Sequence, residues 1–426
     1  MNLFDVYREL PRETEGKIVL VVFDGLGGLP REAGGPTELE DAQTPNLDAL
    51  AADGSCGLLD NVLPGLTPGS GPAHLGLFGY DPLVYDIGRG ILSALGIGFP
   101  VQVGDLCARI NLCTLHPDSR IVLDRRAGRI ASELSRPLIE KLDAIELPDC
   151  EVHVRQVKEY RACLVLRAPD LYDDIDDTDP QSTWEETPLP VAANDERSEK
   201  AADLVRQFAR EAEAVLGEHF ADAADALRGE REDVEAFIAE NHPANGLMLR
   251  GFARYEKLPH LDEIFGIRAA AIATYPMYKG VASLVGMDVL EVGSEEIADE
   301  FACLEQHFSD YDLFFLHIKK CDSYGEDGNW DAKVHVIEEG DGQIPRARAL
   351  DPAVLCVTAD HSTPCVLKSH SWHPVPCALW SRWGRRDAVE VFSESACAGG
   401  GLGRMRGIHL MPTLVAHALG FEKYGA

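Results

Sequence analysis

The chain has 426 residues, enough for two domains or for one large domain with an insertion. Its formal net charge of −32 argues against binding to nucleic acid or to an anionic membrane surface, because both attract basic proteins. The eleven cysteines include no C-x-x-C pair, and the charged amino-terminal segment MNLFDVYREL is unlike a signal peptide. We therefore expect a reduced, cytoplasmic protein without a membrane span.

The first predicted element is a buried strand at Lys17–Phe23, which ends in Asp24 and a run of glycines. Continuous aliphatic runs of this kind are typical of strands covered on both faces in a parallel sheet. Ligands bind at the carboxyl ends of such strands, although an Asp there often only caps the next turn. A helix is expected next, at Thr44–Ala51, with a proline in its first turn.

The stretch Thr67–Pro82, TPGSGPAHLGLFGYDP, holds Ser70 in a glycine-rich turn before an apolar segment. Glycines let a bulky anion approach the backbone, and the unpaired amides of a following helix point at whatever lies beside Ser70. Ser70 is therefore a candidate nucleophile. Taken alone, the stretch is more typical of an ordinary loop that caps a helix.

The pattern changes between about Leu83 and His260. Polar turns separate short β-like runs, and the segment Asn194–His242 predicts two amphipathic surface helices. The acidic run Tyr172–Pro180 is typical of a solvated loop. The β-like runs are Ala108–Leu115, Glu151–Val154 and Ala162–Leu166.

Buried strands return at Ile267–Thr274, Tyr311–Ile318 and Ala353–Thr358, and the last two end in polar residues. With Asp24, these residues make a set of carboxylates and imidazoles that suits Mn²⁺, Zn²⁺ or Mg²⁺ better than a thiolate site would. Any one of them is compatible with a cap or an ion pair, but their recurrence at strand ends favours a metal site. They are Asp322, Glu326, Asp360, His361 and His370.

Six motifs in a consistent order carry a family resemblance: VVFDGLGG, TPNLDALAADG, TPGSGPAHLGLFGYDP, HIKKCDSYGEDG, TADHSTPC and GRMRGIHLMP. Together they resemble the alkaline phosphatase superfamily and, more narrowly, the archaeal-type 2,3-bisphosphoglycerate-independent phosphoglycerate mutases. The resemblance runs from about Lys17 to Ala426. It implies an α/β fold with an alkaline-phosphatase-like sheet flanked by helices and an inserted smaller α+β domain. The metal-binding, phosphatase-like catalytic domain would be residues 1–82 and 261–426, and the substrate-covering domain residues 83–260.

The resemblance also implies two divalent metal ions, with Mn²⁺ favoured over Mg²⁺, Zn²⁺ or Co²⁺, and a nucleophile at Ser70. The ligands of one metal correspond to Asp24, Ser70, Asp360 and His361, and those of the other to Asp322, Glu326 and His370. Basic positions that hold a small phosphorylated acid correspond to Arg125 or Arg129, Arg161, Arg250 and Lys279. No oligomeric state is predicted.

Three positions depart from the family pattern. Glu326 stands where the family normally has a metal-binding histidine, so either this carboxylate binds the metal or the site is weakened. Tyr160 stands where a histidine is frequent, and His373 where an acidic residue is usual. Either change is compatible with a new substrate or with drift.

The expected reaction is the interconversion of 3-phosphoglycerate and 2-phosphoglycerate through a phosphoserine at Ser70, in glycolysis and gluconeogenesis. His74 and the LFGYDP segment support this activity. The alternative is a homoserine-kinase-like phosphotransferase, or a phosphatase of the same superfamily. A non-catalytic binding protein would require the loss of metal binding, which the retention of the metal-site residues argues against.

Overall fold

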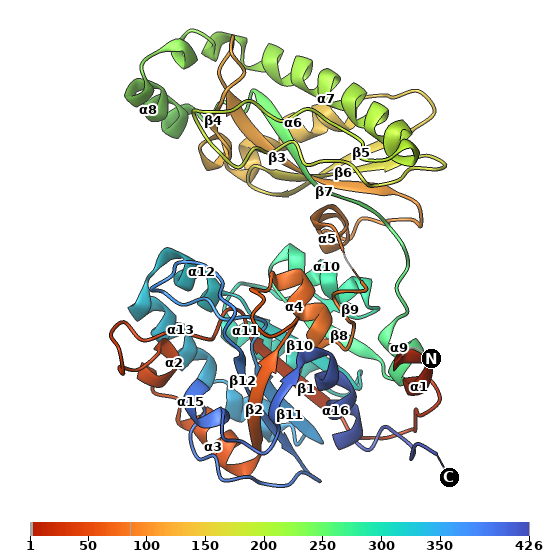
Figure 1. The fold of residues 1–426 in the computed structure, drawn as a ribbon, viewed down its shortest axis with the longest axis vertical. Helices are drawn as coiled ribbons and strands as arrows, with labels where there is room; N and C mark the ends of the chain where they lie inside the picture. Colours follow the sequence, from red (N-terminus) through yellow and green to blue (C-terminus); the bar gives the residue numbers. More distant parts are fainter. Residues whose placement is uncertain (1–2, 86, 426) are drawn as a thin grey trace. The chain divides into compact units, whose positions relative to one another are not determined.

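The computed structural model describes residues 3–85 and 87–425. The chain divides into two compact units, shown in Figure 1: one combines Met1–Asp86 with Leu258–Ala426, and the other is Ile87–Lys257. Among the described residues, no helix combines the length and the apolar character that crossing a membrane requires.

The first unit is built on an eight-stranded sheet with the order β13-β2-β12-β11-β1-β10-β8-β9. Its central strand β1 (Ile18–Phe23) is buried along its whole length, as its aliphatic sequence predicts. The strands from β11 to β9 in this order are parallel, whereas β12 is antiparallel to both of its neighbours. The other strands are β2 (Ser55–Asp60), β8 (Ala269–Ile272), β9 (Asp288–Leu290), β10 (Leu313–Ile318), β11 (Val354–Thr358), β12 (Val375–Ser381) and β13 (Gly403–Arg406).

Helices flank this sheet on both sides (Figure 1), which confirms the expected α/β class. The helix expected at Thr44–Ala51 is α3 (Pro45–Asp53), and the proline stands in its first turn. The other helices of this unit are α1 (Leu3–Tyr7), α2 (Glu38–Asp41), α4 (Ser70–Leu77), α9 (Leu261–Phe265), α10 (Pro276–Leu284), α11 (Ile297–His307), α12 (Lys320–Asp327), α13 (Trp330–Asp341), α14 (Ile344–Ala349), α15 (Glu394–Cys397) and α16 (Leu410–His417), with the short η5 (Gly407–His409).

The register of the three central strands aligns their carboxyl ends. Val22 of β1 is level with His317 of β10 on one side and with Thr358 of β11 on the other. Because all three strands are parallel, the residues that follow them emerge at one edge of the sheet.

The second unit contains an antiparallel sheet with the order β4-β3-β6-β5, in which β7 also pairs with β3. Its strands are β3 (Leu106–Leu115), β4 (Val122–Asp124), β5 (Glu151–Lys158), β6 (Arg161–Arg167) and β7 (Gly246–Arg254). Its helices are α5 (Arg89–Gly96), α6 (Ser132–Asp143), α7 (Glu199–His219) and α8 (Arg231–Asn241), with η1 (Ala127–Arg129), η2 (Glu196–Ser198), η3 (Ala221–Ala223) and η4 (Ala226–Arg228). The three expected β-like runs are parts of β3, β5 and β6, and the two expected surface helices are α7 and α8.

Candidate metal centre

The candidate ligands converge because the strands that precede them are neighbours in the sheet. Asp24 directly follows β1, and Asp360 and His361 follow β11. Asp322 lies in the first turn of α12, which follows β10. Gly25 has a φ of +69°, and a Cβ there would lie 2.9 Å from Cβ of Asp322, so glycine lets the two loops approach each other.

Two compact groups of candidate metal ligands result. Asp24, Asp360 and His361 form one, and Asp322, His361 and His370 form the other, with the ligand atoms of each group within 4.8 Å of one another. Nε2 of His361 lies 3.4 Å from Oδ1 of Asp24 and 3.1 Å from Oδ2 of Asp360. Nε2 of His370 lies 3.3 Å from Oδ1 of Asp322. His361 therefore connects the groups.

Ser70, the first residue of α4, lies beside these groups. Its Oγ is 3.2 Å from Nε2 of His361. Glu326 lies four residues after Asp322 on α12, a spacing that puts both side chains on one face of the helix. Its Oε1 is 4.0 Å from Nε2 of His370, and its side chain is 57% exposed, so it stands at the rim of the second group.

The residues present fit a divalent cation. Oδ1 of Asp24 and Oδ2 of Asp360 are buried, and neither accepts a hydrogen bond from any described residue. Buried carboxylate oxygens require compensation, which a cation provides. The donors are carboxylates, imidazoles and a hydroxyl, a set typical of Mn²⁺, Mg²⁺ or Zn²⁺. Burial raises the pKa of the nearby Cys321 thiol to about 12, so that thiol stays protonated and is a poor ligand.

Burial and the neighbouring charges together explain the pKa shifts of the site. Burial, followed by the charge of Asp360, raises the pKa of Asp24 well above its usual value. Burial would also raise the pKa of Asp322, but a hydrogen bond with His370 and the charge of Lys319 lower it. Burial lowers the pKa of His74 and, more strongly, that of His317, so both imidazoles are neutral.

Hydrogen bonds orient the imidazoles of the groups. The Thr363 hydroxyl donates to Oδ1 of Asp322, 2.9 Å away, so it accepts a hydrogen bond from Nδ1 of His361, 3.0 Å away. This leaves the lone pair of His361 Nε2 directed at Ser70. Nδ1 of His370 likewise donates to the carbonyl of Pro68, 2.9 Å away, which directs Nε2 at Asp322.

Lys319 is a site residue that the sequence analysis did not single out. Its Nζ lies 2.9 Å from Oδ2 of Asp24 and donates to Oδ2 of Asp322 at 2.6 Å, so one ammonium contacts a carboxylate of each group. Burial would lower the pKa of Lys319, but Asp24 and Asp322 raise it. The Tyr278 hydroxyl also donates to Asp24, and the Tyr278 ring stacks on the imidazole of His317. The feature of the sequence that could have identified Lys319 is its position directly after β10, in the motif that contains Asp322.

A buried ion pair holds the two loops that carry Asp24 and Asp360. The Nζ of Lys333, on α13, donates to the carbonyls of Gly27 (3.1 Å) and Thr363 (2.8 Å). The carboxylate of Glu38, on α2, accepts from the amides of Leu29 (3.1 Å) and Cys365 (2.7 Å). The two side chains are fully buried and lie 3.9 Å apart. Each therefore binds one backbone group from each loop.

We expect Lys333→Met to weaken Mn²⁺ binding by roughly 10–100-fold, because residues that position metal ligands contribute about that much. Free Mn²⁺ measured by electron paramagnetic resonance, below the melting temperature of the variant, tests this. Asp105→Asn is the control, since it removes the charge of a buried carboxylate that pairs with Arg167 in the second unit. Equal Mn²⁺ affinities for both variants would contradict the positioning role of Lys333.

The second unit places two of the expected substrate-binding arginines on one carboxylate. Arg125 donates to both oxygens of Asp179, at 2.9 and 2.6 Å, and Arg250 donates to Oδ2 at 3.2 Å. Burial would raise the pKa of Asp179, but the hydrogen bonds of Arg125 lower it. The prediction that Tyr172–Pro180 is a solvated loop is therefore wrong at Asp179, which is 3% exposed. Arg125 and Arg250, which are distant from Asp179 in the sequence, pair with its carboxylate and so stabilise it in a buried position.

The remaining expected substrate-binding residues lie in different settings. Arg161 begins β6, donates to the hydroxyl of Tyr160 and lies over its ring. Arg129 is exposed, in η1. Lys279 lies on α10 in the first unit, 3.7 Å from a carboxylate oxygen of Glu291.

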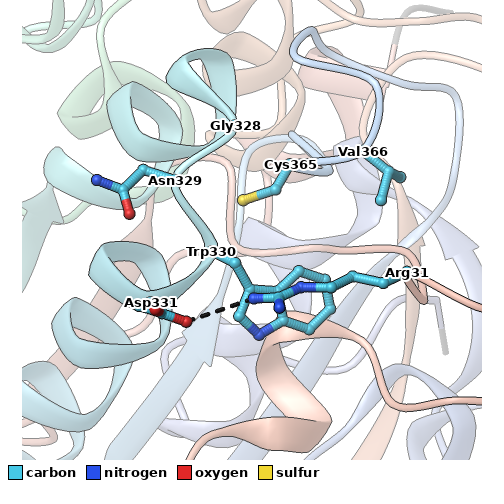
Figure 2. A pocket seen from close by; sticks show the side chains of 7 residues that line it. All are labelled: Arg31, Gly328, Asn329, Trp330, Asp331, Cys365 and Val366. Carbon is cyan, nitrogen blue, oxygen red and sulfur yellow. Dashed lines mark hydrogen bonds and ion pairs between the residues drawn. The ribbon is translucent and has the colours of Figure 1, made fainter.

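A surface cavity of about 390 Å³ lies elsewhere in the first unit (Figure 2). Figure 2 shows the Arg31 side chain over the ring of Trp330, 4.2 Å from its centroid, with Asp331 beside it. None of the lining residues belongs to either candidate metal group. We therefore assign the candidate catalytic site to those groups and not to this cavity. The lining residues are Arg31, Gly328, Asn329, Trp330, Asp331, Cys365 and Val366.

The fold and the site define a class: α/β proteins that place a serine hydroxyl beside a candidate metal centre of carboxylates and imidazoles. Residues 51–221 match the family model described as 2,3-bisphosphoglycerate-independent phosphoglycerate mutase. A relative from Thermus thermophilus, named as a probable enzyme of this kind, is 46% identical over 430 residues, with 100% of both chains covered. A relative of the same name from Deinococcus radiodurans is 45% identical over 432 residues, again with both chains fully covered. The chain belongs to the 2,3-bisphosphoglycerate-independent phosphoglycerate mutase family.

Solved structures agree with this membership. A protein from Pyrococcus horikoshii is 29% identical, with a TM-score of 0.78 over 97% of this chain and 100% of that chain. The cofactor-independent phosphoglycerate mutase from Thermoplasma acidophilum is 28% identical, with a TM-score of 0.68 over 95% of this chain and 100% of that one.

Proposed function

We propose that this protein interconverts 3-phosphoglycerate and 2-phosphoglycerate without 2,3-bisphosphoglycerate, as a cytoplasmic enzyme of glycolysis and gluconeogenesis and a member of the archaeal-type branch. The observation that carries the proposal is the position of Ser70, whose Oγ lies 3.2 Å from Nε2 of His361. His361 belongs to both candidate metal groups. A hydroxyl in this position is suited to receive and return a phosphoryl group.

The residues for two divalent ions, Mn²⁺ foremost, are Asp24, Ser70, Asp360 and His361 for one and Asp322, Glu326 and His370 for the other. When bound, such ions lower the pKa of a serine hydroxyl and stabilise the charge that develops on a transferring phosphoryl group. The tautomer of His361 keeps the Nε2 lone pair available on the Ser70 side.

The Ser70 oxygen forms a bond to phosphorus as the phosphate ester bond of 3-phosphoglycerate breaks, and the proton of the Ser70 hydroxyl ends on the released 3-oxygen of glycerate. The 2-hydroxyl of the retained glycerate then forms a bond to phosphorus as the bond between phosphorus and the Ser70 oxygen breaks, and its proton returns to Ser70. The phosphate and the carboxylate are bound by Arg125, Arg129, Arg161, Arg250 and Lys279. Guanidinium groups pair with both anions in a bidentate manner, whereas the Lys279 ammonium attracts them as a point charge. The inserted domain, residues 83–260, covers the substrate and excludes water, because hydrolysis of the phosphoserine would make the enzyme a phosphatase.

Metal removal tests this proposal. We expect treatment with EDTA to abolish the conversion of 3-phosphoglycerate, and Mn²⁺ to restore it, in an assay that follows the appearance of 2-phosphoglycerate directly by phosphorus NMR. Elemental analysis of the reconstituted protein should find about two ions per chain, by the two-metal arrangement above. One ion per chain would show that Glu326 does not complete the second group. Full activity without any divalent ion would contradict the proposal.

A further inference from the structure

His74 is a buried histidine of α4 that forms a hydrogen bond with the residue that carries the candidate nucleophile. It lies four residues after Ser70, so the two side chains share one face of the helix. Side chains of a helix lean toward its amino terminus, which brings the imidazole back to the first turn. Nδ1 of His74 lies 2.7 Å from the carbonyl oxygen of Ser70. Because a carbonyl oxygen only accepts, Nδ1 carries the proton and Nε2 of the neutral ring does not.

The same N–H group also faces the first metal group. Nδ1 of His74 lies 3.5 Å from Oδ2 of Asp360, the buried carboxylate oxygen that accepts no hydrogen bond from any described residue. Asp360 belongs to the loop after β11, whereas Ser70 begins α4. One imidazole N–H therefore lies between the helix that carries the nucleophile and a loop that carries a candidate metal ligand.

The packing of His74 does not explain why this residue is a histidine. The ring centroids of Tyr278, His317, Phe315 and Phe78 lie 5.0, 5.3, 5.5 and 6.0 Å from that of His74, whose side chain is fully buried. Nε2 of His74 has no hydrogen-bond partner among the described residues, which is unfavourable for a buried nitrogen. Phenylalanine would fill this position without that cost. The feature that only the imidazole supplies is the Nδ1–H donor.

We propose that His74 is a positioning residue for the phosphoryl transfer. The hydrogen bond from its Nδ1–H fixes the first turn of α4 and thereby holds Oγ of Ser70 at its distance of 3.2 Å from Nε2 of His361. A nucleophile that is misplaced by about 1 Å can lose roughly 100-fold in rate. His74 acts through Ser70, so the assignment rests on the proposed function for the identity of the reaction.

Steady-state kinetics of the full-length, Mn²⁺-loaded protein with 3-phosphoglycerate test this role in two variants. His74→Phe removes the donor, whereas His74→Asn keeps one, because the amide nitrogen of asparagine is as many bonds from the Cα atom as Nδ1 of histidine. We expect His74→Phe to lower kcat by roughly 10–100-fold, with KM and Mn²⁺ content unchanged. His74→Asn should recover part of the lost kcat.

Thermal unfolding of the metal-free proteins should give the opposite order. His74→Phe should be at least as stable as the wild type, because it removes the unpaired nitrogen from the ring cluster. His74→Asn should be less stable, because the smaller side chain leaves a cavity. A residue with only a structural role would lose stability and activity together. If His74→Phe does not fold, His74→Leu replaces it, since leucine and asparagine have similar shapes and differ in the donor.

A kcat of His74→Phe equal to that of the wild type would overturn the positioning role, as would a His74→Asn variant no more active than His74→Phe. Wild-type protein that converts no 3-phosphoglycerate would contradict the proposed function instead. The positioning role is then tested with p-nitrophenyl phosphate, which releases p-nitrophenolate as its phosphoryl group is transferred to Ser70, and intact mass reports the labelling. Slower labelling of His74→Phe than of the wild type would support the role. Equal rates, or no labelling of the wild type, would overturn it.

Discussion

Ser70→Ala is expected to reduce turnover by at least about 10⁴-fold, because removing a nucleophile leaves only the contribution of binding and electrostatics. The fold should persist. The Ser70 hydroxyl is hydrogen-bonded to His361. The backbone contacts that position α4 do not involve this hydroxyl. The carbonyl of Ser70 also keeps its hydrogen bond from Nδ1 of His74, 2.7 Å away.

Two measurements check this expectation. One is steady-state kinetics, and the other is intact-mass spectrometry of protein that is mixed with 3-phosphoglycerate and then quenched. The wild type should gain the mass of one phosphoryl group, and the variant should not. Ser362→Ala is the matched control, because Ser362 is a buried serine beside His361 whose hydroxyl donates to a backbone carbonyl, that of His373. Substantial turnover by Ser70→Ala would remove Ser70 as the nucleophile.

Asp360→Asn is expected to have the second largest effect. Oδ1 of Asp360 accepts hydrogen bonds from the amides of Gly25 (3.0 Å) and His361 (2.9 Å), and asparagine retains an oxygen for them. Oδ2 accepts none, and the substitution replaces it with an uncharged donor. Metal affinity should therefore fall by more than the roughly 10–100-fold that follows loss of a supporting residue, and activity should fall with it.

The measurement is Mn²⁺ binding by equilibrium dialysis, with thermal unfolding of the metal-free proteins alongside. Asp341→Asn is the matched control: Asp341 is also buried and accepts hydrogen bonds from the amides of Asn46 and Leu47, but it belongs to neither metal group. A similar fall in Mn²⁺ affinity for both variants would mean that Asp360 is not a ligand.

Much of the first unit could be predicted from local patterns. The aliphatic runs that become β1, β10 and β11 are buried strands, and the polar residues after them mark their carboxyl ends. The sequence does not state which strands are neighbours. The convergence of Asp24, Asp322 and Asp360 depends on β1 lying between β10 and β11, an arrangement set by tertiary packing.

The supporting residues could not be predicted for the same reason. Lys333 lies on a helix of mixed polarity, where lysine is normally solvent-exposed. Its burial depends on two loop carbonyls and on Glu38, which is distant in the sequence. The acidic run around Asp179 likewise resembles a solvated loop until arginines from two other elements are placed beside it.

Phosphorus NMR of the Mn²⁺-loaded protein with 3-phosphoglycerate, in the absence of 2,3-bisphosphoglycerate and ATP, tests the central claim most directly. The proposed function predicts that the signal of 2-phosphoglycerate appears and grows to equilibrium. Inorganic phosphate as the sole product would indicate a phosphatase. An unchanged spectrum would contradict the mutase assignment and favour the homoserine-kinase-like alternative, which the same experiment with ATP and homoserine would then examine.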